Sequence, residues 1–182
     1  MKKTLYYALF LAATAILSTV LMFLVNDLTQ PVIIDKQVKL IEENIGLIYS
    51  AEEGYKRNPE QIKNKYKEID YDGIKEIYEV LDSEGAVYSH IYNVEVAGKN
   101  DVIKMLVAVS NGTIDRVVYY QHAETKNLGE VYTREDVAAQ FIGMPIANSS
   151  VDMIAGASTT GRAVDLALDI VENHYNKEGV GK

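Results

Sequence analysis

The feature that most constrains this chain is a run of 21 residues without a charged side chain, from Leu5 to Val25. At about 1.5 Å per residue, a helix of that length spans roughly 30 Å, the thickness of the hydrocarbon core of a membrane. Lys2 and Lys3 precede the run, and Asp27 is the first acidic residue after it. Such a segment is either an uncleaved membrane anchor or a secretory signal peptide.

The length of the run favours the anchor. A signal peptide has an apolar core of about 7–15 residues and ends at a small-x-small cleavage site. Here the apolar run is longer, and the triplet of that type, Ala13 to Ala15, lies in its middle. We therefore expect a transmembrane anchor over residues 1–26. Because Lys2 and Lys3 mark the cytoplasmic end, we expect a single-pass protein with a cytoplasmic N-terminus and an extracytoplasmic main domain.

The composition excludes several classes of function. The chain has 182 residues and a net charge of −8, which argues against a nucleic-acid-binding protein because phosphate recognition needs clustered lysine and arginine. Without cysteine it forms no disulfide and holds neither an iron–sulfur cluster nor a cysteine-ligated zinc ion. The three histidines are scattered, so we expect no metal site.

Beyond the anchor, residues 27–74 are expected to form a helical connecting region. Apolar residues recur at helical spacing from Asp35, which would serve as the cap, to about Lys56. Pro31 should bend the chain between the anchor and this helix. The polar, lysine-rich stretch from Asn58 to Gly73 has glutamate and aspartate among its lysines, so we interpret it as solvated surface.

Residues 75–182 are expected to form the main domain. Four predicted strands joined by short turns indicate an antiparallel meander; residues 87–96 alternate well, and Asn111–Gly112 is a strong hairpin signal. A short helix should start at Thr133, with Asp136 helping to cap it, and end near Gly143–Pro145. A final helix is expected from Thr160 to Tyr175. The fold class is therefore α+β, with a curved antiparallel sheet flanked by helices; its strands are expected at residues 75–81, 87–96, 102–109 and 113–121.

The stretch from Asp152 to Val164 carries the chemistry. It is a glycine- and alanine-rich turn with three consecutive hydroxyl side chains, and it opens directly into the last helix. Backbone N–H groups at a helix start lack partners and attract phosphate. On physical grounds alone, a simpler interpretation stays open, in which one of these hydroxyls is only an N-cap. The three hydroxyl residues are Ser158, Thr159 and Thr160.

This stretch resembles the covalent flavinylation motif of the FMN-binding domain family. The motif runs Asp, two variable residues, Ser or Thr, Gly, Ala, Ser or Thr, one variable residue, Thr. The chain departs from it at Ala155, where the family has a hydroxyl. The resemblance implies that the last threonine, Thr160, carries FMN through a phosphoester. The matching residues are Asp152, Gly156, Ala157, Ser158 and Thr160.

A second segment, His122 to Gly129, resembles the family's Glu-Thr-Pro-Gly-Leu-Gly loop. Lys126 and Asn127 replace the Pro-Gly of the family pattern, and the alternative interpretation is an ordinary strand-to-helix connection. The resemblance implies that this loop lies close to the flavin, with Lys126 important only if it is turned toward the ring. The matching residues are Glu124, Thr125, Leu128 and Gly129.

Over nearly the whole chain, the sequence is similar to the G subunits of Rnf complexes, which pump ions while passing electrons between ferredoxin and NAD. The resemblance implies a covalent-FMN electron-transfer subunit in a bacterial or archaeal cell membrane, rather than an enzyme alone with catalytic residues of its own. Its implied partners are the other integral membrane subunits and, during maturation, a flavin transferase. Two alternatives stay open, namely an anchored extracytoplasmic flavoprotein outside any pump and a non-redox binding or assembly module.

Overall fold

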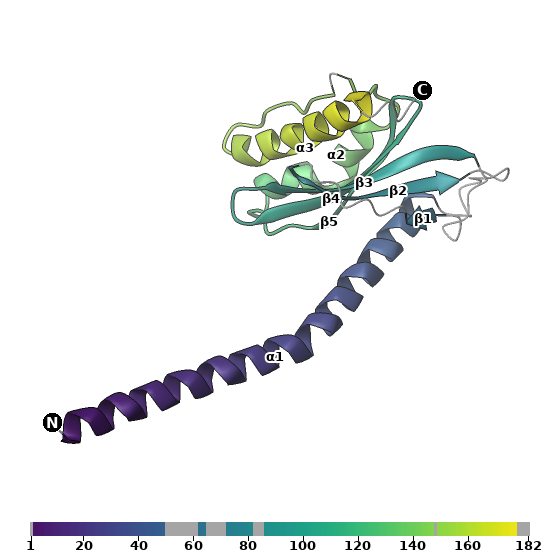
Figure 1. The fold of residues 1–182 in the computed structure, drawn as a ribbon. Helices are drawn as coiled ribbons and strands as arrows, with labels where there is room; N and C mark the ends of the chain where they lie inside the picture. The colour runs from purple at the N-terminus through teal and green to yellow at the C-terminus, as the bar shows by residue number, and fades with distance from the viewer. Residues whose placement is uncertain (1, 50–61, 65–71, 82–85, 148, 178–182) are drawn as a thin grey trace. The chain divides into compact units, whose positions relative to one another are not determined.

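The structure is a computed structural model that describes residues 2–49, 62–64, 72–81, 86–147 and 149–177 (Figure 1). It divides into two compact units, Met1–Glu42 and Glu43–Lys182, and each is considered by itself. The first unit contains most of one helix, α1 (Lys2–Ile48). The second holds the end of that helix, an antiparallel sheet, short helices and a long C-terminal helix.

Helix α1 corrects one expectation. The sequence predicted a separate helix from Asp35, but α1 runs without interruption through Pro31 and Asp35. A proline in a helix interior removes one hydrogen bond and kinks the helix, and a long helix can continue beyond the kink. The end expected near Lys56 lies outside the described residues.

The first part of α1 has the character of a membrane span. Residues Lys3–Ile33 are long and apolar enough to cross a bilayer. Its large apolar side chains are exposed, with Leu17 at 69% and Phe23 at 68% of full exposure. In a water-soluble protein, the apolar face of a helix packs against a core. A helix with exposed apolar side chains on every side is instead typical of a segment surrounded by lipid.

The sheet has five strands in the order β1-β2-β3-β4-β5, all antiparallel. The four predicted strands are confirmed, and the turn at Asn111–Gly112 has positive φ angles of 49° and 75°, as a tight hairpin requires. The sequence analysis missed β1, because this short strand pairs through its backbone and its polar residues show no alternation. The strands are β1 (Ile62–Asn64), β2 (Ile74–Leu81), β3 (Val87–Ala97), β4 (Val102–Ser110) and β5 (Thr113–Gln121).

Helix α3 (Ser158–Lys177) covers one face of the sheet and forms the core with it (Figure 1). The stripe predicted for this helix is buried, with Val164, Leu168 and Val171 fully covered. They pack with Tyr92, Val94 and other inward-facing strand residues in one apolar cluster. The core therefore fixes α3 against the sheet, so the position of its first turn relative to the strand ends is set by packing.

The connection between β5 and α3 differs from the single short helix expected from Thr133. It is divided into η3 (Gly129–Thr133), α2 (Glu135–Ala138) and η4 (Ala139–Phe141). Asp136 lies inside α2 and pairs with the Arg134 side chain, so it does not cap the helix start. The Arg134 hydrogen bond lowers the pKa of Asp136, and both groups are exposed. Helices this short take their shape from surrounding contacts more than from a capping residue.

Candidate functional site

The two sequence motifs meet at the start of α3. Thr160 lies in the first turn of this helix and has no exposed surface. Its hydroxyl donates a 2.5 Å hydrogen bond to Oε2 of Glu124, a residue 36 positions earlier in the chain. The structure therefore joins the last hydroxyl of the predicted flavinylation motif to the first residue of the predicted flavin-adjacent loop.

Glu124 lies in a close-fitting backbone cradle. Its second carboxylate oxygen, Oε1, accepts a 2.9 Å hydrogen bond from the N–H of Lys99, in the turn between β3 and β4. Gly98 and Gly129 border the carboxylate, and a Cβ on either would collide with it. A Cβ on Gly129 would also lie 2.6 Å from the Thr160 hydroxyl oxygen. Both glycines are thus required by space: a side chain at Gly98 would collide with Glu124 and the Asp101 carbonyl, and one at Gly129 with Glu124 and Thr160.

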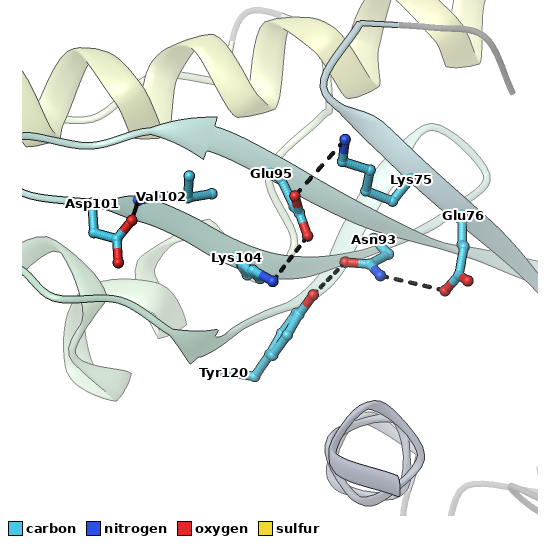
Figure 2. A network of polar contacts seen from close by, with 8 residues as sticks. All are labelled: Lys75, Glu76, Asn93, Glu95, Asp101, Val102, Lys104 and Tyr120. Atoms are coloured by element: carbon cyan, nitrogen blue, oxygen red, sulfur yellow. Dashed lines mark hydrogen bonds and ion pairs between the residues drawn. The ribbon is translucent and has the colours of Figure 1, made fainter. Parts of the chain in front are cut away.

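The turn that supplies Lys99 is stabilised from the sheet. Figure 2 shows Glu95 between two lysines, with its carboxylate 3.2 Å from the Lys104 ammonium and 3.8 Å from that of Lys75. Glu95 and Lys104 are register partners on β3 and β4, a short distance before the turn. Asp101 accepts a 2.7 Å hydrogen bond from the N–H of Val102 in the turn itself. Glu95 and Lys104 are both partly buried, whereas Lys75 is exposed, so the pair across the two strands is the one that helps to keep the strand ends in register.

The loop from Glu124 to Gly129 is held at its base and exposed at its tip. The Asn100 side chain donates to the Ala123 carbonyl at 2.9 Å and to the Thr125 hydroxyl at 3.1 Å. Asn127 has a φ of 60°, a conformation that asparagine tolerates better than most residues. Lys126 is exposed, so its charge is screened by solvent in this structure.

Tyr132 holds the segment that leads into α3. Its hydroxyl donates to the Asp152 carbonyl at 3.1 Å and accepts from the Ile154 N–H at 2.5 Å. The ring lies against Gly161, where a Cβ would approach it to 2.8 Å. Asp165 adds a further tie by accepting a hydrogen bond from the N–H of Val151 at 2.8 Å. Asp152 itself acts here through its backbone, and its side chain is exposed.

Three large apolar side chains stand exposed beside these contacts. We refer to them as the apolar shelf: Leu128 at 41%, Met153 at 48% and Ile154 at 39% of full exposure. Gly156, with a φ of 85°, lies next to them, and its Cβ position would be 3.8 Å from a Leu128 methyl group. Exposed apolar groups gathered around a backbone turn are typical of a ligand or partner surface.

The structure changes how the three consecutive hydroxyls are understood. Thr160 is buried beneath Glu124 and Gly129, whereas Ser158 is half-buried and Thr159 exposed. For Thr160 the N-cap interpretation receives no support, because its side chain bonds to Glu124 and not to the backbone of its own first turn. Ala157 is buried just before the helix, and Ala155, the departure from the motif, is exposed in the turn.

Sequence reasoning missed Gly98, Lys99 and Tyr132. Gly98 and Lys99 contribute space and a backbone N–H, which leave no side-chain pattern, and Tyr132 resembles any core aromatic. The only available signal was the glycine at the end of a predicted strand, since such a glycine permits close approach of another segment.

The arrangement suits an amphipathic ligand with an anionic end. The first-turn N–H groups of α3 have no intrahelical acceptors, and side chains on a helix tilt toward its N-terminus, as Thr160 does. The apolar shelf lies on the preceding segment and on the facing loop. No group of three or more metal-ligating side chains occurs among the described residues. A separate hollow of about 680 Å³ lies along β5, near Leu47 and Ala139, and includes none of the predicted site residues.

Comparison with known proteins bears on this site. Residues 98–171 match the family described as the FMN-binding domain, a segment that begins at Gly98 and ends within α3. The G subunit of an ion-translocating oxidoreductase complex from Methanosarcina acetivorans is 31% identical over 112 residues, covering 56% of this chain and 60% of that protein. The crystal structure of NqrC from Shewanella oneidensis gives a TM-score of 0.47 at 27% identity, over 62% of this chain and 63% of that one. The chain thus spans less than two thirds of either protein.

Proposed function

Because the chain carries a domain of the FMN-binding domain family, as its motifs indicated, we propose that FMN is attached to Thr160 through a phosphoester. The observation that carries this proposal is the contact between Thr160 and Glu124. Two motifs that resemble different parts of the family pattern are distant in sequence, yet they share one hydrogen bond inside the matched segment. An ordinary strand-to-helix connection would not require its glutamate to bind the hydroxyl of Thr160.

The residues around Thr160 fit such a cofactor. The phosphate would lie at the first turn of α3, where unpaired N–H groups favour an anion. The apolar shelf would cover part of the ring, and Leu128 would limit water there. When bound, FMN supplies one- and two-electron chemistry, while the protein sets its position and electronic environment. A covalent link also retains the cofactor without a deep phosphate pocket.

The proposed role is that of an electron-carrying subunit in a membrane complex of the Rnf type, between ferredoxin and NAD. The support is the similarity to a protein named as the G subunit of an ion-translocating oxidoreductase complex, together with the single candidate span Lys3–Ile33 among the described residues. The partners would be the integral membrane subunits of the complex, and a flavin transferase would install the cofactor. We place residues 1–26 in the membrane, residues 27–74 in a connecting region and residues 75–182 in the FMN-binding domain.

The proposed orientation follows from the ends of the span. Lys2 and Lys3 precede it, so the N-terminus should remain in the cytoplasm and the FMN-binding domain should face outward from a bacterial or archaeal cell membrane. Protease added to spheroplasts should then cleave the domain. Cleavage only from the cytoplasmic side of sealed inverted vesicles would contradict the orientation, and a mature N-terminus near Asn26 would contradict the anchor.

Flavin fluorescence in a denaturing gel tests the covalent cofactor. The full-length protein, isolated from membranes, should fluoresce as a flavoprotein after complete unfolding. Thr160→Val should abolish the signal, whereas Thr159→Val, which removes the exposed neighbouring hydroxyl, should retain it. An unlabelled wild-type protein would contradict covalent attachment and leave the binding or assembly module as the better account.

Isolation under mild detergent conditions separates the pump subunit from an anchored flavoprotein outside any pump. A tagged full-length chain should bring down several integral membrane proteins in fixed proportion. A fluorescent flavoprotein recovered alone, from membranes in which such subunits are produced, would favour the free-standing flavoprotein.

A further inference from the structure

We propose that Glu124 accepts the proton of the Thr160 hydroxyl when the phosphoester forms, so that the chain itself supplies the base for its own flavinylation. This inference rests on the proposed function. It assigns a chemical role to a residue that the family resemblance placed only near the flavin ring. The evidence is the short hydrogen bond from Thr160 to Oε2 of Glu124 and the way the carboxylate is held.

The stability of the fold does not require a carboxylate at position 124. The side chain is 9% exposed, and among the described residues no cation pairs with it. Its hydrogen-bond donors in this part of the structure are one backbone N–H, from Lys99, and one hydroxyl, from Thr160. A buried carboxylate without a counter-charge costs folding free energy that hydrogen bonds offset only in part, and such groups concentrate at functional sites.

The step balances with one co-reactant, a flavin phosphoanhydride. A free phosphate monoester does not condense with an alcohol in water, so the flavin phosphorus must carry a leaving group. The Thr160 oxygen forms a bond to that phosphorus as the phosphoanhydride P–O bond breaks, and the electron pair leaves with the departing phosphate. The hydroxyl proton passes to Oε2 of Glu124, which already accepts a hydrogen bond from this hydroxyl, as a general base must.

The same geometry indicates where the flavin phosphorus would approach. Thr160 has no exposed surface, and Gly129 is one of the groups that cover its oxygen. Gly129 follows the exposed loop tip, residues 125–128, whereas the Glu124 carboxylate is held separately by the N–H of Lys99 on the neighbouring turn. Displacement of the tip would uncover the hydroxyl on the Gly129 side and leave Glu124 in contact with it.

A competing role makes the opposite prediction. If Glu124 only closed over Thr160, its removal would free the hydroxyl and speed the attachment of flavin. Glutamine in place of Glu124 keeps the shape and an acceptor oxygen but lacks basicity. Alanine leaves a space in which formate could replace the carboxylate.

The experiment measures the initial rate of flavin incorporation into the full-length, flavin-free chain. The protein is produced in cells that lack a flavin transferase, then mixed with a purified transferase and flavin adenine dinucleotide. Glu124→Gln should slow incorporation by about 10²-fold or more, the range for loss of a general base. The matched control is Glu130→Gln, which alters a carboxylate of the same region that accepts from Asn127 and does not contact Thr160; its rate should stay within about twofold. Formate should partly restore the rate of Glu124→Ala without changing its melting temperature.

The possible results of this experiment distinguish the role of Glu124 from the proposed function. Glu124→Gln incorporation at the wild-type rate, or faster, would overturn the proton-acceptor role while leaving Thr160 as the attachment site. A slow Glu124→Ala that formate does not rescue would also overturn it, because the residue would then act only through structure. Failure of the wild-type chain to take up any flavin would instead overturn the proposed function.

Discussion

The two ends of α3 are both joined to the sheet by a side-chain hydroxyl, but they differ in what surrounds that hydroxyl. At the last turn, Tyr175 accepts a 2.8 Å hydrogen bond from the N–H of Gly112 in the β4–β5 turn. Next to it, the His174 ring lies edge-on to Tyr92, with ring centroids 5.6 Å apart. At the first turn, Thr160 donates to a buried carboxylate between two loops, with exposed apolar side chains close by.

The difference separates a contact that serves stability from one that serves chemistry. The Tyr175 contact satisfies a backbone donor with a neutral group and closes the core, which is what stability requires. The Thr160 contact joins a nucleophilic oxygen to a buried carboxylate, and a residue that only capped the helix would not need that partner. Changes at the last turn should therefore affect unfolding, and changes at the first turn should affect flavin attachment.

Replacing Gly129 with alanine should have the largest effect at the first turn. The new methyl group would lie 2.6 Å from the Thr160 oxygen and closer still to Glu124, so the pair must separate. Overpacking of this kind costs about 1–3 kcal/mol of the free energy of unfolding. We expect that loss in denaturant unfolding, together with at least a tenfold slower flavin incorporation. Thr125→Ala, in the same loop, should change both by much less, and equal effects would contradict the cradle.

A matched pair of tyrosine variants contrasts the two ends directly. Tyr132→Phe and Tyr175→Phe each remove a hydroxyl that accepts a hydrogen bond from a backbone N–H, and Tyr132 also loses its bond to the Asp152 carbonyl, so they should cost about 2 and about 1 kcal/mol in the free energy of unfolding. Only Tyr132→Phe releases the segment that leads to Thr160. Flavin incorporation, measured at equal folded fraction, should fall in Tyr132→Phe and remain unchanged in Tyr175→Phe. Equal rates in the two variants would show that Tyr132 does not position the site.

The apolar shelf allows a smaller test on the flavin-loaded protein. Leu128→Ala should let water reach the ring and favour its charged reduced forms, which raises the midpoint potential. Lys126→Ala should leave the potential nearly unchanged, because the lysine is exposed and its charge is screened. A redox titration followed by flavin absorbance measures both. Unchanged potentials and spectra in both variants would contradict contact between this loop and the ring.

The smallest expected effect lies on the outer surface of α3, midway between its two ends. Burial, and then the neighbouring Asp165 and Glu172, raise the pKa of Asp169. A raised carboxyl pKa means that the ionised form is less favourable in the folded chain, so Asp169→Asn should stabilise the protein at neutral pH. The gain should be well under about 1 kcal/mol, because this group is largely solvated. It should vanish as the pH falls below the usual aspartate value near 4, in urea unfolding at each pH.

Much of the fold follows from local pattern. The four long strands are apolar runs bounded by turn residues, and α3 has a clear apolar stripe, so both could be predicted. Where pattern was weak, the predictions failed. β1 has no alternation, and the residues after Thr133 form three short elements whose bounds depend on tertiary contacts. The separate helix predicted from Asp35 was wrong because a proline can bend a helix without ending it.

The site was predictable in parts and not as a whole. Thr160 and Glu124 each came from a local motif, but their contact joins residues 36 positions apart, and no spacing rule reveals it. The burial of Thr160 was missed for the same reason, since it depends on Gly129 from another segment. The Lys99 N–H contributes through the backbone, which the identity of a side chain does not encode.

The central claim, that the first turn of α3 is the flavin attachment site, is tested most directly by peptide mapping of the full-length protein isolated from membranes. After proteolysis, mass spectrometry of the flavin-labelled peptide should place the FMN phosphoryl group on Thr160 alone. The mass added should equal FMN minus water, as a phosphoester requires. Flavin located on Thr159 or Ser158, or flavin released intact on denaturation, would contradict the account.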